Sequence, residues 1–291
     1  MSLHLAALLL ISLLLIFFSS FLTPSHASTN SFIFAGCSQL KYTPGSAYES
    51  NLNSLLTSFV NSATYSSYNN FTILGSTSQD VVYGLYQCRG DLSMPDCAMC
   101  VAHSVTQIGT ICPDSTGGAL QLQGCFIKYD NTTFLGVEDK SVLVNKCGPS
   151  IMGYNQGDLM GRRDAVLAGL GSGGGPYRVG ASGKVQGVAQ CVGDLSMSEC
   201  QDCVSESIRR LKSECGAAAS GDMFLGKCYA RYSAGSVGGS VDSKSGSGGS
   251  SSSNDGERAF AITIGLLAGV ALIIVFLSFI RKVVGGKGGK S

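Results

Sequence analysis

The chain has 291 residues, of which 13% are charged, and its formal net charge is +1. This length allows one to three domains, and a charge so close to zero gives no reason to expect nucleic acid or an acidic substrate as a partner. The composition is unusual in its 39 glycines and 12 cysteines, and the two ends of the chain indicate which compartment those cysteines enter.

Residues 1–27 have the features of a secretory signal peptide. An apolar run extends from Met1 to Phe21 and is followed by Ser25-His26-Ala27. Small residues at the first and third positions of this triplet predict cleavage after Ala27. The alternative is an uncleaved N-terminal membrane anchor.

The C-terminal region predicts a single membrane span. A linker rich in glycine and serine, 234–258, precedes the 22 uncharged residues from Ala259 to Ile280, which are enough to cross a bilayer. Basic residues in 281–291, beginning with Arg281 and Lys282, predict a cytoplasmic tail. We therefore expect a single-pass type I protein of the plasma membrane with an extracellular N-terminus. All 12 cysteines then become candidates for disulfides.

A cysteine pattern occurs twice in the chain. The spacing C-x8-C-x2-C begins at Cys88 and again at Cys191, and both copies contain Gly-Asp-Leu-Ser-Met. The same offset relates Cys112 to Cys215, and it also relates Cys125 to Cys228. The duplication predicts two domains, 28–137 and 138–233, with six cysteines each.

Local patterns predict the same elements in both domains. In the first we expect a helix over 44–64, strands at 71–75 and 81–87, a helix from a capping box at Ser93 and Asp96 to about Gly109, and strands at 119–129 and 133–137. In the second we expect a helix around 159–170, a hairpin over 177–190, a capping box at Ser196 and Glu199, and a strand at 223–232. The predicted fold class is α+β. It comprises two tandem small disulfide-stapled domains, each with two helices packed on a roughly five-stranded antiparallel sheet, plus one transmembrane helix.

Chemical motifs are few. The two Cys-x-x-Cys segments, at Cys97 and Cys200, could be redox pairs or zinc ligands, but the predicted mature chain holds a single histidine, His103, so we interpret them as structural disulfides. Asp91 and Asp194 are interpreted as turn or capping residues. We predict no catalytic residue, cofactor or metal, and therefore no enzyme.

Two further features concern modification and the membrane. Asn70-Phe-Thr72 and Asn131-Thr-Thr133 are N-glycosylation sequons. Gly265-x-x-x-Gly269 lies in the predicted span and would allow a close helix–helix contact.

Two C-x8-C-x2-C domains, a signal peptide, one span and a short tail resemble the plasmodesmata-located proteins, a plant family with tandem ginkbilobin-like cysteine-rich domains. Sequence alone allows fifteen pairings of six cysteines. The resemblance implies the pairs Cys37–Cys112, Cys88–Cys97, Cys100–Cys125, Cys147–Cys215, Cys191–Cys200 and Cys203–Cys228. An antifungal member of the wider ginkbilobin-like family binds mannose through an Asn, an Arg and a Glu. Ser38 and Gly148 stand where that Asn is expected, so the resemblance implies that this sugar site is not retained, which leaves another cell-wall carbohydrate site open.

The resemblance further implies a location at plasmodesmata, where the protein would modulate channel permeability and cell-to-cell trafficking, in part through callose deposition. Implied partners are the plasma membrane, related proteins in homo- or hetero-oligomers, receptor kinases, viral movement proteins and cell-wall glycans, with no nucleic acid. The alternative is an extracellular glycan-binding receptor or co-receptor that signals through a partner kinase.

Overall fold

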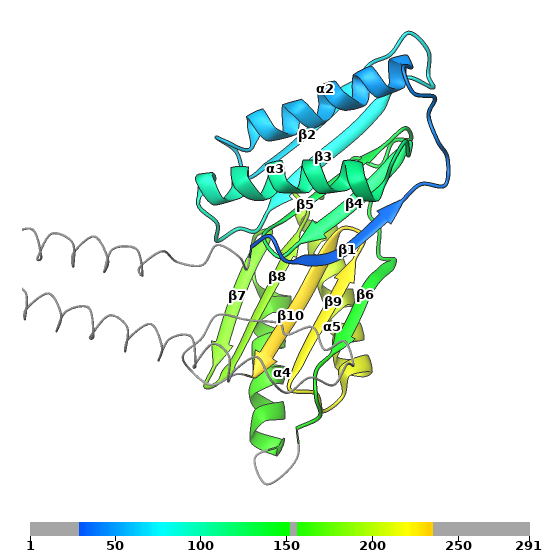
Figure 1. Cartoon of the computed structure of the whole chain (residues 1–291). Coiled ribbons are helices and arrows are strands. Elements are labelled where there is room, and N and C mark those ends of the chain that lie inside the picture. The colour runs from blue at the N-terminus through cyan, green and yellow to red at the C-terminus, as the bar shows by residue number, and fades with distance from the viewer. Residues whose placement is uncertain (1–28, 152–155, 235–291) are drawn as a thin grey trace, which may run out of the picture. The chain divides into compact units, whose positions relative to one another are not determined.

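The computed structural model describes residues 29–151 and 156–234 (Figure 1). The predicted signal peptide and the predicted span, with Gly265 and Gly269, lie outside the described residues. Among the helices within these two ranges, none combines the length and apolar character needed to cross a membrane.

The first domain is a five-stranded antiparallel sheet with two helices. The helices are α2 (Ala47–Ser62) and α3 (Met94–Ile111), and Figure 1 shows both on one face of the sheet. The strands are β1 (Phe32–Cys37), β2 (Tyr68–Ile73), β3 (Val82–Cys88), β4 (Gly117–Leu122) and β5 (Cys125–Asp130). Their order in the sheet is β1-β4-β5-β3-β2, which leaves β1 and β2 at the edges.

The second domain repeats this arrangement element for element. Its helices are α4 (Gln156–Ser172) and α5 (Met197–Cys215). Its strands are β6 (Val142–Cys147), β7 (Tyr177–Ser182), β8 (Val185–Cys191), β9 (Ser220–Leu225) and β10 (Cys228–Ala234), in the order β6-β9-β10-β8-β7. The predicted tandem of α+β domains is thereby confirmed.

The segment between the domains differs from the prediction. Residues 133–137 form no strand, because Phe134 and Leu135 pack onto an apolar cluster instead of pairing with a neighbouring strand. The fifth strand of the first sheet is β1, which pairs with β4. β2 also begins earlier than predicted, at Tyr68, since residues 68–73 all pair with β3.

Both helices that follow the repeated motif begin at the predicted serines. Ser93 Oγ accepts a hydrogen bond from the backbone N–H of Asp96, and Ser196 Oγ accepts one from that of Glu199. The Glu199 carboxylate also accepts the N–H of Ser196 at 2.9 Å, which completes a capping box. Each helix therefore starts at a fixed residue, three or four positions before its first cysteine.

Each domain has its own core, stapled by three disulfides. Leu55, Phe59, Tyr86 and Ile127 are buried in the first core, and Leu167, Leu211 and Met223 are buried in the second. The disulfides are Cys37–Cys112, Cys88–Cys97, Cys100–Cys125, Cys147–Cys215, Cys191–Cys200 and Cys203–Cys228. These are the pairs that the family resemblance implies, and no cysteine of the chain is free.

Candidate functional site

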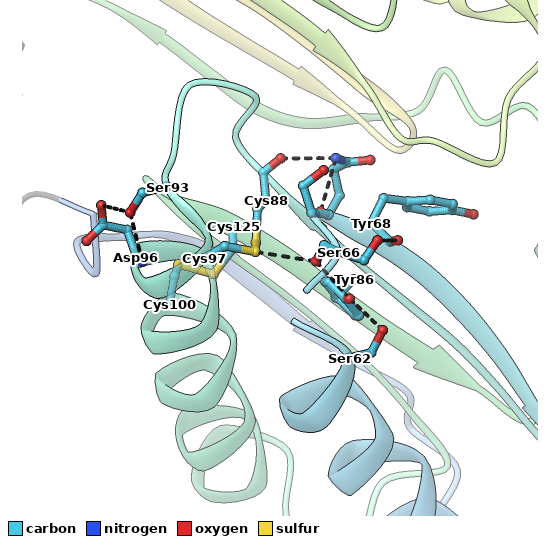
Figure 2. Close-up of a disulfide and its surroundings, with 12 residues drawn as sticks. Ser62, Ser66, Tyr68, Tyr86, Cys88, Ser93, Asp96, Cys97, Cys100 and Cys125 are labelled. Carbon is cyan, nitrogen blue, oxygen red and sulfur yellow. Dashed lines mark hydrogen bonds between the residues drawn. A yellow bond between two sulfur atoms is a disulfide. The ribbon is translucent and has the colours of Figure 1, made fainter. Parts of the chain in front are cut away.

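The two copies of Gly-Asp-Leu-Ser-Met lie in loops that connect a strand to a helix. One loop joins β3 to α3 and the other joins β8 to α5. In the first loop the Cys88–Cys97 disulfide ties the end of the strand to the first turn of the helix, beside the Ser93–Asp96 cap (Figure 2). Cys191–Cys200 does the same in the second. The covalent tie and the cap hold both loops in defined conformations.

Each loop carries a glycine on which a tyrosine of the other domain rests. Tyr177, the first residue of β7, lies so close to Gly90 that a Cβ there would be 2.4 Å from its ring. Tyr68, the first residue of β2, lies on Gly193, where a Cβ would be 2.7 Å from the ring. Only glycine leaves room for this approach. The two contacts are reciprocal, because the motif loop of each domain packs against the first tyrosine of a hairpin in the other domain.

Glutamines from matching strands make hydrogen bonds across the same junction. The backbone N–H of Gly193 donates to Gln87 Oε1 at 3.0 Å, and Gln190 Nε2 donates to the carbonyl of Cys88 at 2.9 Å. Arg231 Nη1 donates to Gln123 Oε1 at 2.5 Å. Each of these bonds joins a group of the first domain to a group of the second. Together they fix the position of one domain against the other.

An apolar cluster lies beside these polar contacts. Leu85, Phe126 and Val192 are buried together, although they come from different domains. Phe34 lies 6.3 Å from Phe126 and 6.4 Å from Phe224 between ring centroids, so it joins the two sheets. In β3 the side chains alternate, with Tyr86 directed to the helix-covered core and Leu85 to this cluster. The junction therefore uses the sheet faces that the helices leave open.

A buried ion pair marks the second loop. Lys227 Nζ contacts the Asp194 carboxylate, and their side chains are only 1% and 4% exposed. Lys227 Nζ also donates to the carbonyl of Phe134 at 3.0 Å, while the N–H of Gly136 donates to Asp194 at 2.9 Å. The interdomain segment is thus held against the second domain. Burial lowers the pKa of Lys227 below its usual value, with the Asp194 charge opposing that shift.

The first loop has an ion pair that is open to solvent. Asp91 pairs with Arg89 at 2.6 Å, with side chains 47% and 27% exposed. Burial opposes ionisation of Asp91, but the hydrogen bonds and the charge of Arg89 outweigh it and hold the pKa of this carboxyl below its usual value. Asp91 and Asp194 both lie in turns, as expected. The sequence did not indicate that Asp194 would be buried at a domain contact.

The chemistry of this junction is that of a protein interface. A cavity of about 30 Å³ lies between the sheets and is lined by Gln87, Gln190, Arg89, Lys227 and their neighbours. That volume holds one or two water molecules and no metabolite. Among residues 29–151 and 156–234, no cluster of three or more His, Cys, Asp or Glu side chains is arranged to hold a metal ion.

The remaining predicted residues lie apart from this junction or at its rim. Asn70 is exposed on β2, and Asn131 follows the end of β5. Ser38 Oγ accepts the N–H of Leu40, and Gly148 is packed against Ser220. The sequence reasoning missed Tyr68, Tyr177, Gly90 and Gly193. The available signal was the glycine repeated at the same place in both motifs, together with a tyrosine at the start of each hairpin.

Comparison with known proteins gives consistent matches. The sequence matches the salt stress response/antifungal family over residues 36–132 and 164–235. It is 61% identical to plasmodesmata-located protein 7 of Arabidopsis thaliana, covering 90% of this chain and 86% of that protein. Identity to plasmodesmata-located protein 6 of the same plant is 59%, covering 92% and 94%.

A solved structure agrees with these matches. The tandem ectodomain of the Arabidopsis thaliana cysteine-rich receptor-like protein PDLP5 is 51% identical and superposes with a TM-score of 0.68, covering 70% of this chain and all of that one. The chain therefore belongs to the plasmodesmata-located protein family, and its two domains are of the salt stress response/antifungal type.

Proposed function

We propose that this protein is a non-enzymatic type I membrane protein of plasmodesmata that modulates cell-to-cell trafficking, in part through callose deposition. The tandem domains lie outside the cell, residues 259–280 span the membrane, and 281–291 form a cytoplasmic tail. The observation that carries the proposal is the 61% identity to a plasmodesmata-located protein over most of both chains. Agreement at this level across the tandem domains supports a shared location.

The site geometry supports a role through surfaces and partners. At the junction, deeply buried polar side chains are already engaged in contacts between or within the two domains, as Gln190, Lys227 and Asp194 illustrate. The protein then acts through the outer surfaces of its two disulfide-bonded domains. We propose homo- or hetero-oligomers with related proteins as its first partners, and receptor kinases, viral movement proteins and cell-wall glycans as further ones.

A fluorescent fusion at the C-terminus of the full chain tests this proposal. We expect punctate signal at cell junctions, and a change in the spread of a small dye and in callose staining when the fusion is overexpressed. A matched control ends at residue 258 and lacks the predicted span, so it should be secreted and leave dye movement unchanged. Uniform signal over the plasma membrane with unchanged dye movement would contradict the proposal.

A second candidate function is a receptor or co-receptor for wall glycans that signals through a partner kinase. The observation that favours it is that the similar PDLP5 ectodomain is described as receptor-like. Binding of the purified protein to a glycan array at micromolar concentration supports this function. No binding to any wall polysaccharide leaves the trafficking role as the better account.

A further inference from the structure

The first sequon lies on the face of the first sheet that meets the second domain. Tyr68, Asn70 and Thr72 occupy alternate positions of β2, so their side chains project from one face. Across the strand pair they lie opposite Gln87, Leu85 and Tyr83. Leu85 belongs to the interdomain cluster. The sequon therefore extends outward from the rim of the junction.

The Asn70 amide is in contact with the tyrosine that bridges the domains. Asn70 Nδ2 donates a hydrogen bond to Tyr68 Oη at 2.7 Å. Asn70 and Thr72 are exposed, whereas Tyr68 is half-buried, with its ring against Gly193 of the second domain. One side chain thus connects the nitrogen that a glycan would modify to the loop of the other domain.

We propose that Asn70 carries an N-linked glycan whose first N-acetylglucosamine packs against Tyr68 and thereby stabilises the domain junction. This inference rests on the proposed extracellular position of the domains, where sequons are modified. In the transfer, Asn70 Nδ2 loses one proton to solvent and forms a bond to C1 of the sugar. The bond from C1 to a lipid diphosphate donor breaks, and the lipid diphosphate leaves.

The geometry favours a stabilising contact. The modified amide keeps one N–H, which is available to donate to Tyr68 Oη. The C–H groups of a pyranose carry slight positive charge and suit the negative face of an aromatic ring. The sugar would cover the part of Tyr68 that is still open to solvent, which holds the ring against Gly193.

The second sequon lacks this arrangement and provides a matched control. The aromatic residue two positions before Asn131 is Tyr129, which is 2% exposed and donates to the carbonyl of Ser115 at 3.2 Å. That ring is buried in the core, so a sugar on Asn131 cannot pack against it. A glycan at Asn131 should therefore leave the stability of the junction unchanged.

The test uses the full chain purified in detergent from plant cells. Peptide mass spectrometry should find Asn70 modified. Thermal unfolding followed by circular dichroism should give a melting temperature lower by roughly 2–4 °C for Asn70→Gln and unchanged for Asn131→Gln. Protein trimmed with an endoglycosidase to a single N-acetylglucosamine should keep the full melting temperature, because only the first sugar reaches Tyr68.

A double-mutant cycle with Tyr68→Leu isolates the contact, since this variant keeps an apolar side chain but removes the ring. We expect Asn70→Gln to have no further effect in the Tyr68→Leu background. An equal loss in both backgrounds overturns the sugar–ring contact. An unmodified Asn70 in protein that still reaches plasmodesmata overturns the inference and leaves the proposed function intact. Free thiols and no glycan at either sequon would overturn both.

The same arrangement of a tyrosine and a sequon can be introduced into the second domain by substitution. Strand pairing places Tyr177, Val179 and Ala181 of β7 where β2 has Tyr68, Asn70 and Thr72, and Val179 is 68% exposed. The double variant Val179→Asn/Ala181→Thr creates a sequon two residues after a tyrosine that rests on Gly90. We expect it to be glycosylated and to melt about 2–4 °C higher than the same variant after complete deglycosylation. A modified variant with no such gain would overturn the proposed mechanism.

Discussion

At the scale of single residues, the glycines of the repeated motif decide whether the domains can meet. Replacing Gly193 with Ala puts a Cβ 2.7 Å from the Tyr68 ring, and Gly90→Ala puts one 2.4 Å from Tyr177. Both rings have to move, and overpacking of this kind costs about 1–3 kcal/mol. We expect each variant to lower the free energy of unfolding by that amount in urea denaturation.

A helical glycine serves as the control for this pair. Gly109 lies inside α3, and a Cβ there would meet nothing within 4 Å. Ala has the higher helix propensity, so Gly109→Ala should stabilise the domain by about 0.5–1 kcal/mol. If all three variants changed stability in the same direction, the close approach of the tyrosines would not be the cause.

Replacing the two aspartates of the motif should lower the free energy of unfolding by very different amounts. Asp194→Asn leaves Lys227 charged in a site where its side chain is 1% exposed, and removing one partner of a buried pair costs about 3–5 kcal/mol. Asp91→Asn breaks a pair that water reaches, so its cost should stay below about 1 kcal/mol. Urea denaturation of the two variants measures the difference. Equal costs would show that Lys227 finds another partner.

At the scale of helices and strands, the sequence predicts what local chemistry specifies. The helices after the motif start at Ser93 and Ser196 because their hydroxyl groups accept backbone N–H groups three residues on. The segment 133–137 has the composition of a strand, yet it lies across the junction, since Phe134 packs there and the carbonyl of Phe134 accepts a hydrogen bond from Lys227. That outcome depends on contacts with residues about 90 positions away, which no local pattern encodes.

Glu206, on α5, should make a pH-dependent contribution to the stability of the fold. Hydrogen bonds from Arg209 and Arg210 lower the pKa of Glu206 to about 2, against 4.5 for a free glutamate. Because the pKa is lower in the folded state, this carboxylate stabilises the fold above pH 4.5, and the effect is lost as the pH falls toward 2. Glu206→Gln should therefore lower the melting temperature slightly at pH 7 and not at pH 2. Water reaches these side chains, so the loss should be below about 1 kcal/mol.

The disulfides of one domain should contribute unequally. Cys37–Cys112 closes a loop of 75 residues, while Cys88–Cys97 closes one of 9. In the chain-entropy model these loops correspond to about 4.5 and about 2.6 kcal/mol. Paired Cys→Ala variants compared by urea denaturation should therefore rank the long loop above the short one. The reverse order would point to local strain or packing at the motif loop as the larger effect.

At the scale of the whole molecule, the relation between the two domains is what the sequence did not reveal. The duplication predicts two copies of one fold, but it does not indicate which faces they present to each other. A hint existed in β3, where Leu85 and Tyr86 are adjacent and apolar, which places hydrophobic side chains on both faces of the strand. If helices covered the sheet on one side alone, Leu85 would be exposed to water on the other side. The second domain supplies the missing cover.

This relation predicts that the tandem unfolds as one unit. Phe126 is 6% exposed and packs in the cluster shared with Val192, while Phe34 contacts both Phe126 and Phe224. Separating the domains would expose these side chains to water, so neither domain should open alone. Calorimetry of the full chain should show a single transition for the two domains, with the calorimetric enthalpy equal to the van't Hoff enthalpy.

Phe126→Ala removes about 3 kcal/mol of packing from the junction and from neither helix-covered core, so it should split that transition in two. Tyr65→Ala provides the comparison, because Tyr65 is a large aromatic residue that is 72% exposed, and it should leave one transition. Two transitions in the unaltered protein would mean that the contacts between the sheets are too weak to couple the domains, and each would then present its surfaces independently.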